Sequence, residues 1–221
     1  MSTEVADNLK RLWEEMPPSV QLIAVSKTKP VTDIMKAYEA GQRDFGENRI
    51  QEMAEKHEQL PKDIRWHMIG HVQGNKIKYM APFVHMVHGM DKPKRFMELN
   101  NEAAKVNRVI DGLLQVHIAT EETKFGFSYA EAKDFLSQDI AGIYPNIRLR
   151  GLMGMATFTY DPDQLRKEFR TLYRFYSHER QLNRHPHFDI LSIGMSGDFK
   201  IAIEEGSTMV RVGQAIFGVR N

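Results

Sequence analysis

The sequence contains no cysteine, no long apolar run and no excess of either charge. Without cysteine, disulfide bonds and thiolate metal sites are excluded, and we expect a cytoplasmic protein. The 30 basic residues balance the 29 acidic ones to a net charge of +1, which predicts no strong attraction to nucleic acid or membrane. No segment approaches the ~18 apolar residues of a membrane span, and the charged residues 1–16 lack the apolar stretch of a signal peptide.

What the chain does have is enough apolar material for one core. Its 221 residues are 42% hydrophobic, which suits a single domain. No linker rich in proline, glycine or serine divides it, and no low-complexity tract is present. We therefore predict one domain spanning residues 1–221.

Short apolar runs alternate with longer amphipathic segments along this domain. The apolar runs predict eight strands, at residues 22–25, 44–45, 65–69, 84–87, 112–118, 149–155, 190–193 and 209–212. Helical patterns lie between them, at residues 31–40, 49–59, 76–79, 92–107, 129–136, 164–181 and 199–205. A further helix at residues 5–16 precedes the first strand and ends before two prolines.

The alternation of strand and helix indicates a parallel sheet with right-handed crossovers. Eight such units in this length favour a closed (β/α)8 barrel preceded by the extra helix. An open, doubly wound sheet is the alternative. In a barrel, reactive side chains gather where the strands end and the following loops begin, so these positions decide what chemistry is available.

A lysine lies just after the first predicted strand, in the segment Ser26-Lys27-Thr28-Lys29-Pro30. At the rim of a barrel, the Lys27 ammonium would lose water and its pKa would fall. The neutral amine is then a nucleophile toward an aldehyde. The competing interpretation is that Lys27 or Lys29 is an ordinary solvated loop lysine, because most lysines are exposed.

Glycine and serine follow the last two predicted strands, at residues 192–198 and 211–215. Glycines let the backbone approach an anion, and Ser192 and Ser196 add hydroxyl donors. Phosphate sites after strands seven and eight recur in barrels, and Arg211 would suit a phosphate or a ring nitrogen. Ordinary turn chemistry explains a single loop of this kind equally well. Two such loops beside a lysine on strand one favour an anion site.

Other polar residues lie at the remaining strand ends. Asn48 follows the second strand, where it would line a ligand pocket, cap the next helix, or do both. His67 and His71 are four residues apart but lie on a strand and its loop, and no suitably spaced carboxylate accompanies them, so we predict no metal site. Lys124, after the fifth strand, adds a basic group near the barrel mouth.

Taken together, these motifs resemble the pyridoxal phosphate homeostasis protein family. The resemblance runs from about residue 20 to the end of the chain and is carried by AVSKTKP (24–30), FGENR (45–49), WHMIGHVQGNK (66–76), LSIGMSGD (191–198) and GSTMVRVGQAIFG (206–218). It implies a barrel like the N-terminal domain of alanine racemase, with pyridoxal 5′-phosphate held as a Schiff base on Lys27.

The resemblance also implies the rest of the cofactor site. Ser192, Ser196, Gly213 and Gln214 match the positions that hold the phosphate, Arg211 matches an arginine beside the cofactor, and Asn48 matches a residue lining the pocket. The chain departs from the family pattern at Gly154 and Gln214, where threonine is common, and at residues 88–91, where a serine-containing motif is usual. A contact from the Gln214 backbone N–H does not depend on the side chain and would be the same with threonine at this position.

For function, the resemblance implies a protein that carries and buffers the cofactor in vitamin B6 homeostasis without catalytic turnover. Apo-forms of pyridoxal phosphate-dependent enzymes are the expected partners, and a monomer is expected. The first alternative is a minimal amino-acid racemase, which needs a second acid/base group. Tyr160 is a candidate for it, since the barrel leaves no residues for a second domain. The second alternative is an aldolase-like or isomerase-like barrel that uses its lysine without a cofactor.

Overall fold

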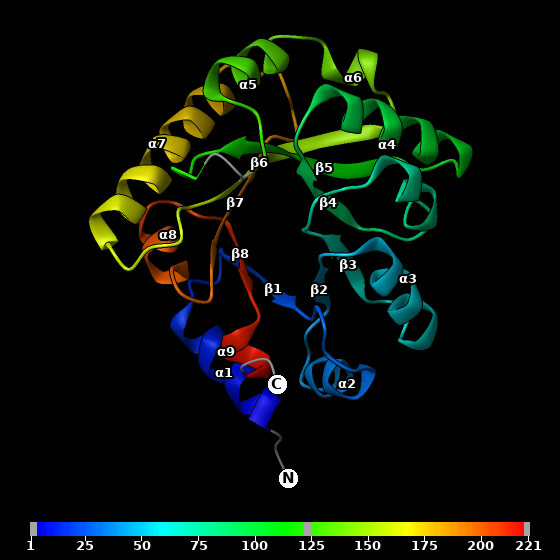
Figure 1. Ribbon diagram of the computed structural model, residues 1–221, viewed down its shortest axis with the longest axis vertical. Coiled ribbons are helices and arrows are strands. Elements are labelled where there is room, and N and C mark those ends of the chain that lie inside the picture. Colours follow the sequence, from blue (N-terminus) through cyan, green and yellow to red (C-terminus); the bar gives the residue numbers. More distant parts are fainter. Residues whose placement is uncertain (1–3, 122–124, 219–221) are drawn as a thin grey trace.

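The computed structural model describes residues 4–121 and 125–218, in which eight parallel strands close into a barrel with the helices outside it (Figure 1). Each strand pairs with the next one along the chain, and β8 (Met209–Val212) pairs with β1 (Gln21–Val25) to close the ring. This confirms the predicted (β/α)8 barrel with its amino-terminal helix and excludes the open sheet. In the described part of the chain, no helix is long and apolar enough to cross a bilayer.

The elements follow the predicted order closely. The strands between the first and the last are β2 (Asp44–Glu47), β3 (Arg65–Met68), β4 (Met86–Met90), β5 (Ile110–His117), β6 (Ile147–Met155) and β7 (Ile190–Met195). The helices are α1 (Glu4–Glu15), α2 (Val31–Glu39), α3 (Ile50–Gln59), the 3-10 helix η1 (Gly74–Tyr79), α4 (Pro93–Lys105), α5 (Tyr129–Leu136), α6 (Ile140–Ile143), α7 (Pro162–Gln181), α8 (Phe199–Glu204) and α9 (Gln214–Phe217).

The structure differs from the prediction at one strand and at two short helices. The fourth strand begins at Met86 instead of residue 84, because the amide of Val84 closes a turn onto the Met80 carbonyl at 2.8 Å. Helices α6 and α9 were not predicted. Each has four residues, which is too short to show a helical period. Helix α9 matters for the architecture, since Asn8 of α1 donates a hydrogen bond to the Ile216 carbonyl at 3.0 Å and the first and last helices lie side by side (Figure 1).

Apolar side chains form two layers. The larger one lies between the strands and the surrounding helices. The smaller one fills the inside of the barrel with one residue from each of six strands: Ile23, Met86, Leu113, Met153, Ile190 and Met209. Neither β2 nor β3 contributes to this inner layer. Side chains two apart on a strand share a face, so Ser192, Arg211 and His88 also face inward, next to Ile190, Met209 and Met86.

At the amino-terminal ends of the strands, carboxylates pair with arginines. Asp44 of β2 accepts two hydrogen bonds from Arg65 of β3, at 2.7 and 2.6 Å. Asp111 of β5 accepts one bond from each of two arginines of β6, Arg148 and Arg150. The bidentate pair of Asp44 with Arg65 and the two bonds to Asp111 join neighbouring strands. This end of the barrel is therefore built for stability, as is usual for the fold.

Candidate functional site

Lys27 lies two residues beyond the end of β1, in a tight loop at the carboxyl-terminal face of the barrel, and its side chain is half-buried. The next residue, Thr28, has a positive φ of 64°, a conformation that costs a non-glycine residue free energy. The amide of Lys29 bonds back to the Ser26 carbonyl at 3.0 Å. The chain therefore places the lysine where the sequence predicted it, in a loop that needs support from its neighbours.

That support comes from Glu47 of β2 and from two side chains of α3, Glu52 and Lys56. Ser26 Oγ donates to Glu47 Oε1 at 2.6 Å, and Lys56 Nζ donates to the Ser26 carbonyl at 2.8 Å. On the other side of Lys27, the amide of Thr28 donates to Glu52 Oε1 at 2.6 Å. We call Glu47, Glu52 and Lys56 the loop clamp, because they fix the residues before and after Lys27.

The loop clamp is itself tied together by charge. Lys56 Nζ lies 2.8 Å from Glu47 Oε1 and 2.7 Å from Glu52 Oε1. Glu47 is fully buried, and its Oε2 has no hydrogen-bond partner among the described residues. Burial disfavours the charged form and raises the pKa of Glu47 to about 7, against the opposing effects of Lys56 and Ser26. A proton on Glu47 therefore titrates near neutral pH, directly behind the lysine loop.

Arg211 is buried inside the barrel near the carboxyl end of β8. One guanidinium nitrogen donates to the carbonyl and to the hydroxyl of Ser192, at 2.8 and 2.6 Å, and another donates to the Gly154 carbonyl at 3.0 Å. Burial lowers the pKa of Arg211 to about 10, opposed by Asp198, so the guanidinium stays charged at neutral pH. The structure thus joins Arg211 to Ser192, two of the predicted site residues.

The loops after β7 and β8 meet at the same face. Ser196 Oγ accepts a hydrogen bond from the amide of Gly213 at 3.2 Å. A Cβ on Gly213 would lie 2.9 Å from the Val25 carbonyl oxygen, so only glycine lets this loop approach the end of β1 so closely. A Cβ on Gly197 would meet nothing within 4 Å, and Gln214 is exposed. The two loops therefore lie side by side and face open space next to the lysine strand.

Asn48 lies at the end of β2 and lines a cavity of about 460 Å³. The cavity also contacts Arg49, His71, Gln73 and Lys76, so its walls are polar and basic. Arg49 rather than Asn48 precedes the first residue of α3, and no side chain caps that helix. Asn48 therefore lines a cavity, and its side chain makes no capping bond to α3.

Several other candidates have different surroundings. Lys29 Nζ donates to the carbonyls of Phe217 and Gly218 at the end of α9, at 3.0 and 3.4 Å. Tyr160 is 95% exposed on the loop after β6. His71 lies 3.3 Å from Asp91 and stacks on Phe125. Lys124 lies outside the described residues.

The sequence did not reveal the residues that support the candidate site through hydrogen bonds without lining it. The sequence shows neither the loop clamp nor the contact between His67 and His88, whose ring nitrogens lie 3.0 Å apart inside the barrel. The only available signal was polar residues at inward positions of otherwise apolar strands, such as His67 on β3 and His88 on β4. Both are fully buried, and buried polar groups require partners.

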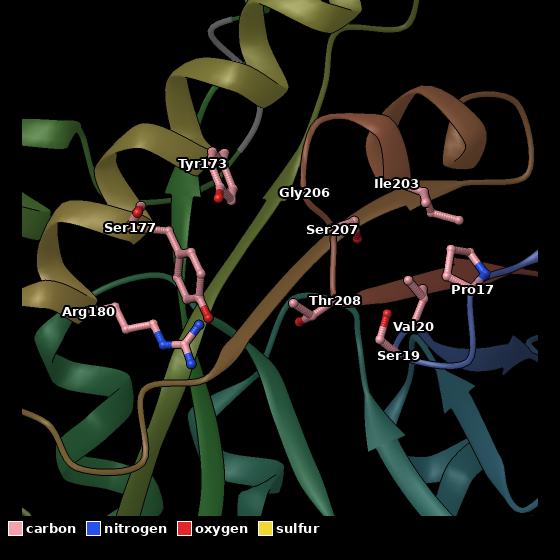
Figure 2. Close-up of a pocket in the computed structure, with 11 residues that line it drawn as sticks. Pro17, Ser19, Val20, Tyr173, Ser177, Arg180, Ile203, Gly206, Ser207 and Thr208 are labelled. Carbon is pink, nitrogen blue, oxygen red and sulfur yellow. The ribbon is translucent and has the colours of Figure 1, made fainter.

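A second cavity, of about 340 Å³, lies at the opposite end of the barrel. Figure 2 shows its walls, with Tyr173, Ser177 and Arg180 of α7 on one side and Ser19 and other residues near the start of β1 on the other. The amino-terminal ends of strands rarely carry chemistry in this fold. Since the cavity is remote from Lys27, it is not part of the candidate site.

Comparison with known proteins agrees with this geometry. A family model described as the N-terminal domain of alanine racemase matches residues 2–221. The pyridoxal phosphate homeostasis protein of Vibrio alginolyticus is 42% identical over 211 residues, covering 93% of this chain and 88% of that one. Its counterpart in Escherichia coli K12 is 37% identical over 210 residues, with the same coverage of 93% and 88%.

Solved structures show the same relationship. PipY of Synechococcus elongatus with pyridoxal phosphate bound is 33% identical with a TM-score of 0.88, covering 97% of this chain and 100% of that one. Alanine racemase of Bartonella henselae, with covalently bound pyridoxal phosphate, is 16% identical with a TM-score of 0.73 and covers 98% of this chain but 58% of that one. The latter likeness concerns the fold alone.

Proposed function

This chain belongs to the alanine racemase N-terminal domain family, and on that premise we propose that it binds pyridoxal 5′-phosphate through Lys27 and serves in vitamin B6 homeostasis. The whole of residues 1–221 would act as one cofactor-binding domain. The observation that carries the proposal is the position of Lys27, half-buried in a clamped loop next to the glycine-serine loops after β7 and β8. Relatives named as pyridoxal phosphate homeostasis proteins support it.

The residues present fit this cofactor. Pyridoxal phosphate combines an aldehyde, a dianionic phosphate and a pyridine ring. The neutral amine of Lys27 would attack the aldehyde carbon, a C=N double bond would form, and the carbonyl oxygen would leave as water. The product is a Schiff base that hydrolysis reverses, which is what a carrier requires.

The remaining predicted residues take complementary roles in this proposal. Ser196, Gly213 and Gln214 would hold the phosphate, because their loops face open space where backbone and hydroxyl donors can surround an anion. Arg211 would lie beside the pyridine ring as a fixed cation. For Ser192, which the resemblance places on the phosphate, we propose a different role. It is fully buried and would act through Arg211, since its hydroxyl and carbonyl both accept hydrogen bonds from that guanidinium. Asn48 would close the pocket from β2.

We further propose that the protein carries the cofactor without catalytic turnover and delivers it to apo-enzymes as a cytoplasmic monomer. Racemisation needs two acid/base groups on opposite faces of the substrate α-carbon. Lys27 can serve one face. Tyr160, the tyrosine considered for the other, is 95% exposed, and the ring beside it in the described part of the chain, Phe158, is 86% exposed. The homeostasis names of the relatives support the same conclusion.

The visible spectrum of the purified protein tests the binding proposal. After incubation with pyridoxal phosphate and removal of excess, the wild-type protein should be yellow and retain the visible absorption band of a Schiff base. Lys27→Ala should lose this band. Lys29→Ala is the matched control and should keep it, because the Lys29 amine bonds the carbonyls at the end of α9. A band that persists in Lys27→Ala would refute the assignment.

The racemase alternative has its own test. Purified, cofactor-loaded protein at high concentration should leave the enantiomeric ratio of alanine unchanged over hours, measured by chiral chromatography. Interconversion that disappears in Tyr160→Phe would instead support the minimal racemase. The alternative in which the lysine acts without a cofactor predicts a colourless protein. A visible band in the same preparation would therefore exclude this alternative, and its absence would support it.

A further inference from the structure

A continuous chain of hydrogen bonds runs through the inside of the barrel from Arg211 to the opposite end. Ser192 Oγ, which accepts from Arg211, lies 3.1 Å from His88 Nδ1. His88 Nε2 lies 3.0 Å from His67 Nδ1. His67 Nε2 lies 3.0 Å from Asp44 Oδ1. We call Ser192, His88, His67 and Asp44 the interior chain.

The interior chain crosses the barrel. His67 and Asp44 come from the neighbouring strands β3 and β2, whereas the contact between His88 of β4 and Ser192 of β7 spans strands that do not pair with each other (Figure 1). Ser192, His67 and His88 are fully buried, and Asp44 is 6% exposed. Beyond Asp44 the series of hydrogen bonds continues to Arg65, whose side chain is 46% exposed at the start of β3. It therefore links the face that carries Lys27 with the amino-terminal face.

Arg211 and Asp44, at the two ends of this series of hydrogen bonds, restrict where its protons can lie. A guanidinium can only donate hydrogen bonds and an ionised carboxylate can only accept them. Burial alone would raise the pKa of Asp44, but hydrogen bonds from Arg65 and His67 outweigh it and hold the pKa well below its usual range. Asp44 is thus ionised, and His67 must donate to it from Nε2.

The same logic then passes along the chain. If the His67 ring carries hydrogen at Nε2 alone, it accepts at Nδ1, and His88 then donates from its own Nε2 and accepts at Nδ1 from the Ser192 hydroxyl. The Ser192 oxygen is left to accept from Arg211, which agrees with the observed bond. Burial, together with the nearby Arg211 guanidinium, keeps the pKa of His88 well below its usual value, which favours the neutral ring. Every hydrogen points from Arg211 toward Asp44.

Arg211 benefits from this alignment. Within the described residues, its hydrogen bonds go to two carbonyls and one hydroxyl. A buried cation with neutral partners is costly. Bonds aligned in one direction polarise one another, so the chain brings part of the Asp44 charge to the Ser192 oxygen.

We propose that Asp44, His67 and His88 are positioning residues for the cofactor site: through Ser192 they hold the Arg211 guanidinium in one orientation and stabilise its charge beside the bound ring. The inference about Arg211 and the cofactor rests on the proposed function, whereas the arrangement of protons does not. The interior chain therefore offers two separate tests.

The first test reads the protons directly in the cofactor-free protein. Long-range ¹H–¹⁵N spectra of the histidine rings, assigned with His67→Gln and His88→Gln, report which nitrogen carries hydrogen. We expect both His67 and His88 to be neutral and protonated at Nε2 at neutral pH. A His88 ring protonated at Nδ1, or at both nitrogens, would overturn the inference whether or not the protein binds pyridoxal phosphate.

The second test breaks the chain without touching Arg211. His88→Leu should weaken retention of pyridoxal phosphate by about tenfold, the order expected from losing one buried hydrogen bond, and should shift the visible band. His85→Leu is the matched control. The His85 ring also packs against His67, with centroids 5.3 Å apart, but it is not a member of the interior chain. Its affinity and spectrum should stay close to wild type.

The outcomes separate the two proposals. If the wild-type protein retains no pyridoxal phosphate, the proposed function is refuted. The histidine ring spectra still test the proton arrangement, because they are recorded without the cofactor. If the wild-type protein retains it and His88→Leu matches His85→Leu in affinity and band position, the positioning role is refuted while the proposed function stands. Circular dichroism and unfolding curves identify a variant that has lost its fold, in which case the wild-type ring spectra decide.

Discussion

The position of a single residue at the candidate site depends on hydrogen bonds from residues outside the site. Lys27 is placed by its own strand, but the backbone on either side of it is fixed by Glu47, Glu52 and Lys56. The rim lysine was visible in the sequence because it directly follows an apolar run. The loop clamp was not visible, because the sequence of α3 has the pattern of an ordinary amphipathic helix. No neighbouring residue in the sequence indicates that Lys56 donates a hydrogen bond to the Ser26 carbonyl.

Glu47 gives this arrangement a pH signature. Its pKa rises from 4.5 to about 7 on folding, so the folded state binds the proton more tightly than the unfolded state does. Its contribution to stability is therefore fully present below about pH 4.5 and is lost as the pH rises through about 7. Glu47→Gln, which cannot ionise, lacks this loss.

We expect the difference in unfolding free energy, wild type minus Glu47→Gln, to decrease between pH 5 and pH 8. Urea denaturation at several pH values measures it. Lys56 keeps its bonds to Glu52 and to the Ser26 carbonyl in this variant, so the fold should be retained. A difference that is constant or grows with pH would show that Glu47 is already ionised at pH 5.

At the level of elements, the sequence predicted the strands and helices well because their apolar periods and end signals are strong. The eight strands appear in the predicted order, and the predicted helix at residues 129–136 is α5 with the same bounds. Its Ser128 and Glu131 form a reciprocal cap, a signal that a sequence displays directly. Short elements such as α6 and α9 lack such a period, and the contacts between strands depend on closure of the barrel.

One strand contact depends on a single glycine. Gly151 of β6 has a φ of 145°, and a Cβ there would lie 1.8 Å from the Ile190 carbonyl oxygen of β7. Gly151→Ala should therefore destabilise the protein by about 3 kcal/mol or more, through backbone strain and displacement of β7. Thermal unfolding would measure the loss.

Gly112 of the neighbouring strand β5 is the matched control for Gly151. A Cβ at Gly112 would meet its nearest atom at 3.5 Å, an ordinary contact. Gly112→Ala should leave the melting temperature within a few degrees of wild type. Equal melting temperatures for the two variants would contradict the role assigned to the Gly151 backbone.

The molecule as a whole joins a stable end to a reactive one. Paired carboxylates and arginines hold the amino-terminal ends of the strands, while the carboxyl-terminal ends bring together Lys27, Arg211 and the two glycine-serine loops. The polar interior that connects them could not be predicted from the sequence, because it depends on five strands closing around one axis. The candidate residues named from the sequence nevertheless lie at one face of the barrel, as the fold requires.

The central claim is that the Lys27 amine forms the covalent bond to pyridoxal phosphate. Borohydride reduction of the loaded wild-type protein makes that bond permanent, and peptide mapping by mass spectrometry then locates it. The account predicts one pyridoxyl phosphate group per chain, on the peptide that contains Lys27. A label on another lysine, or no label in a protein that retains the cofactor, would contradict it.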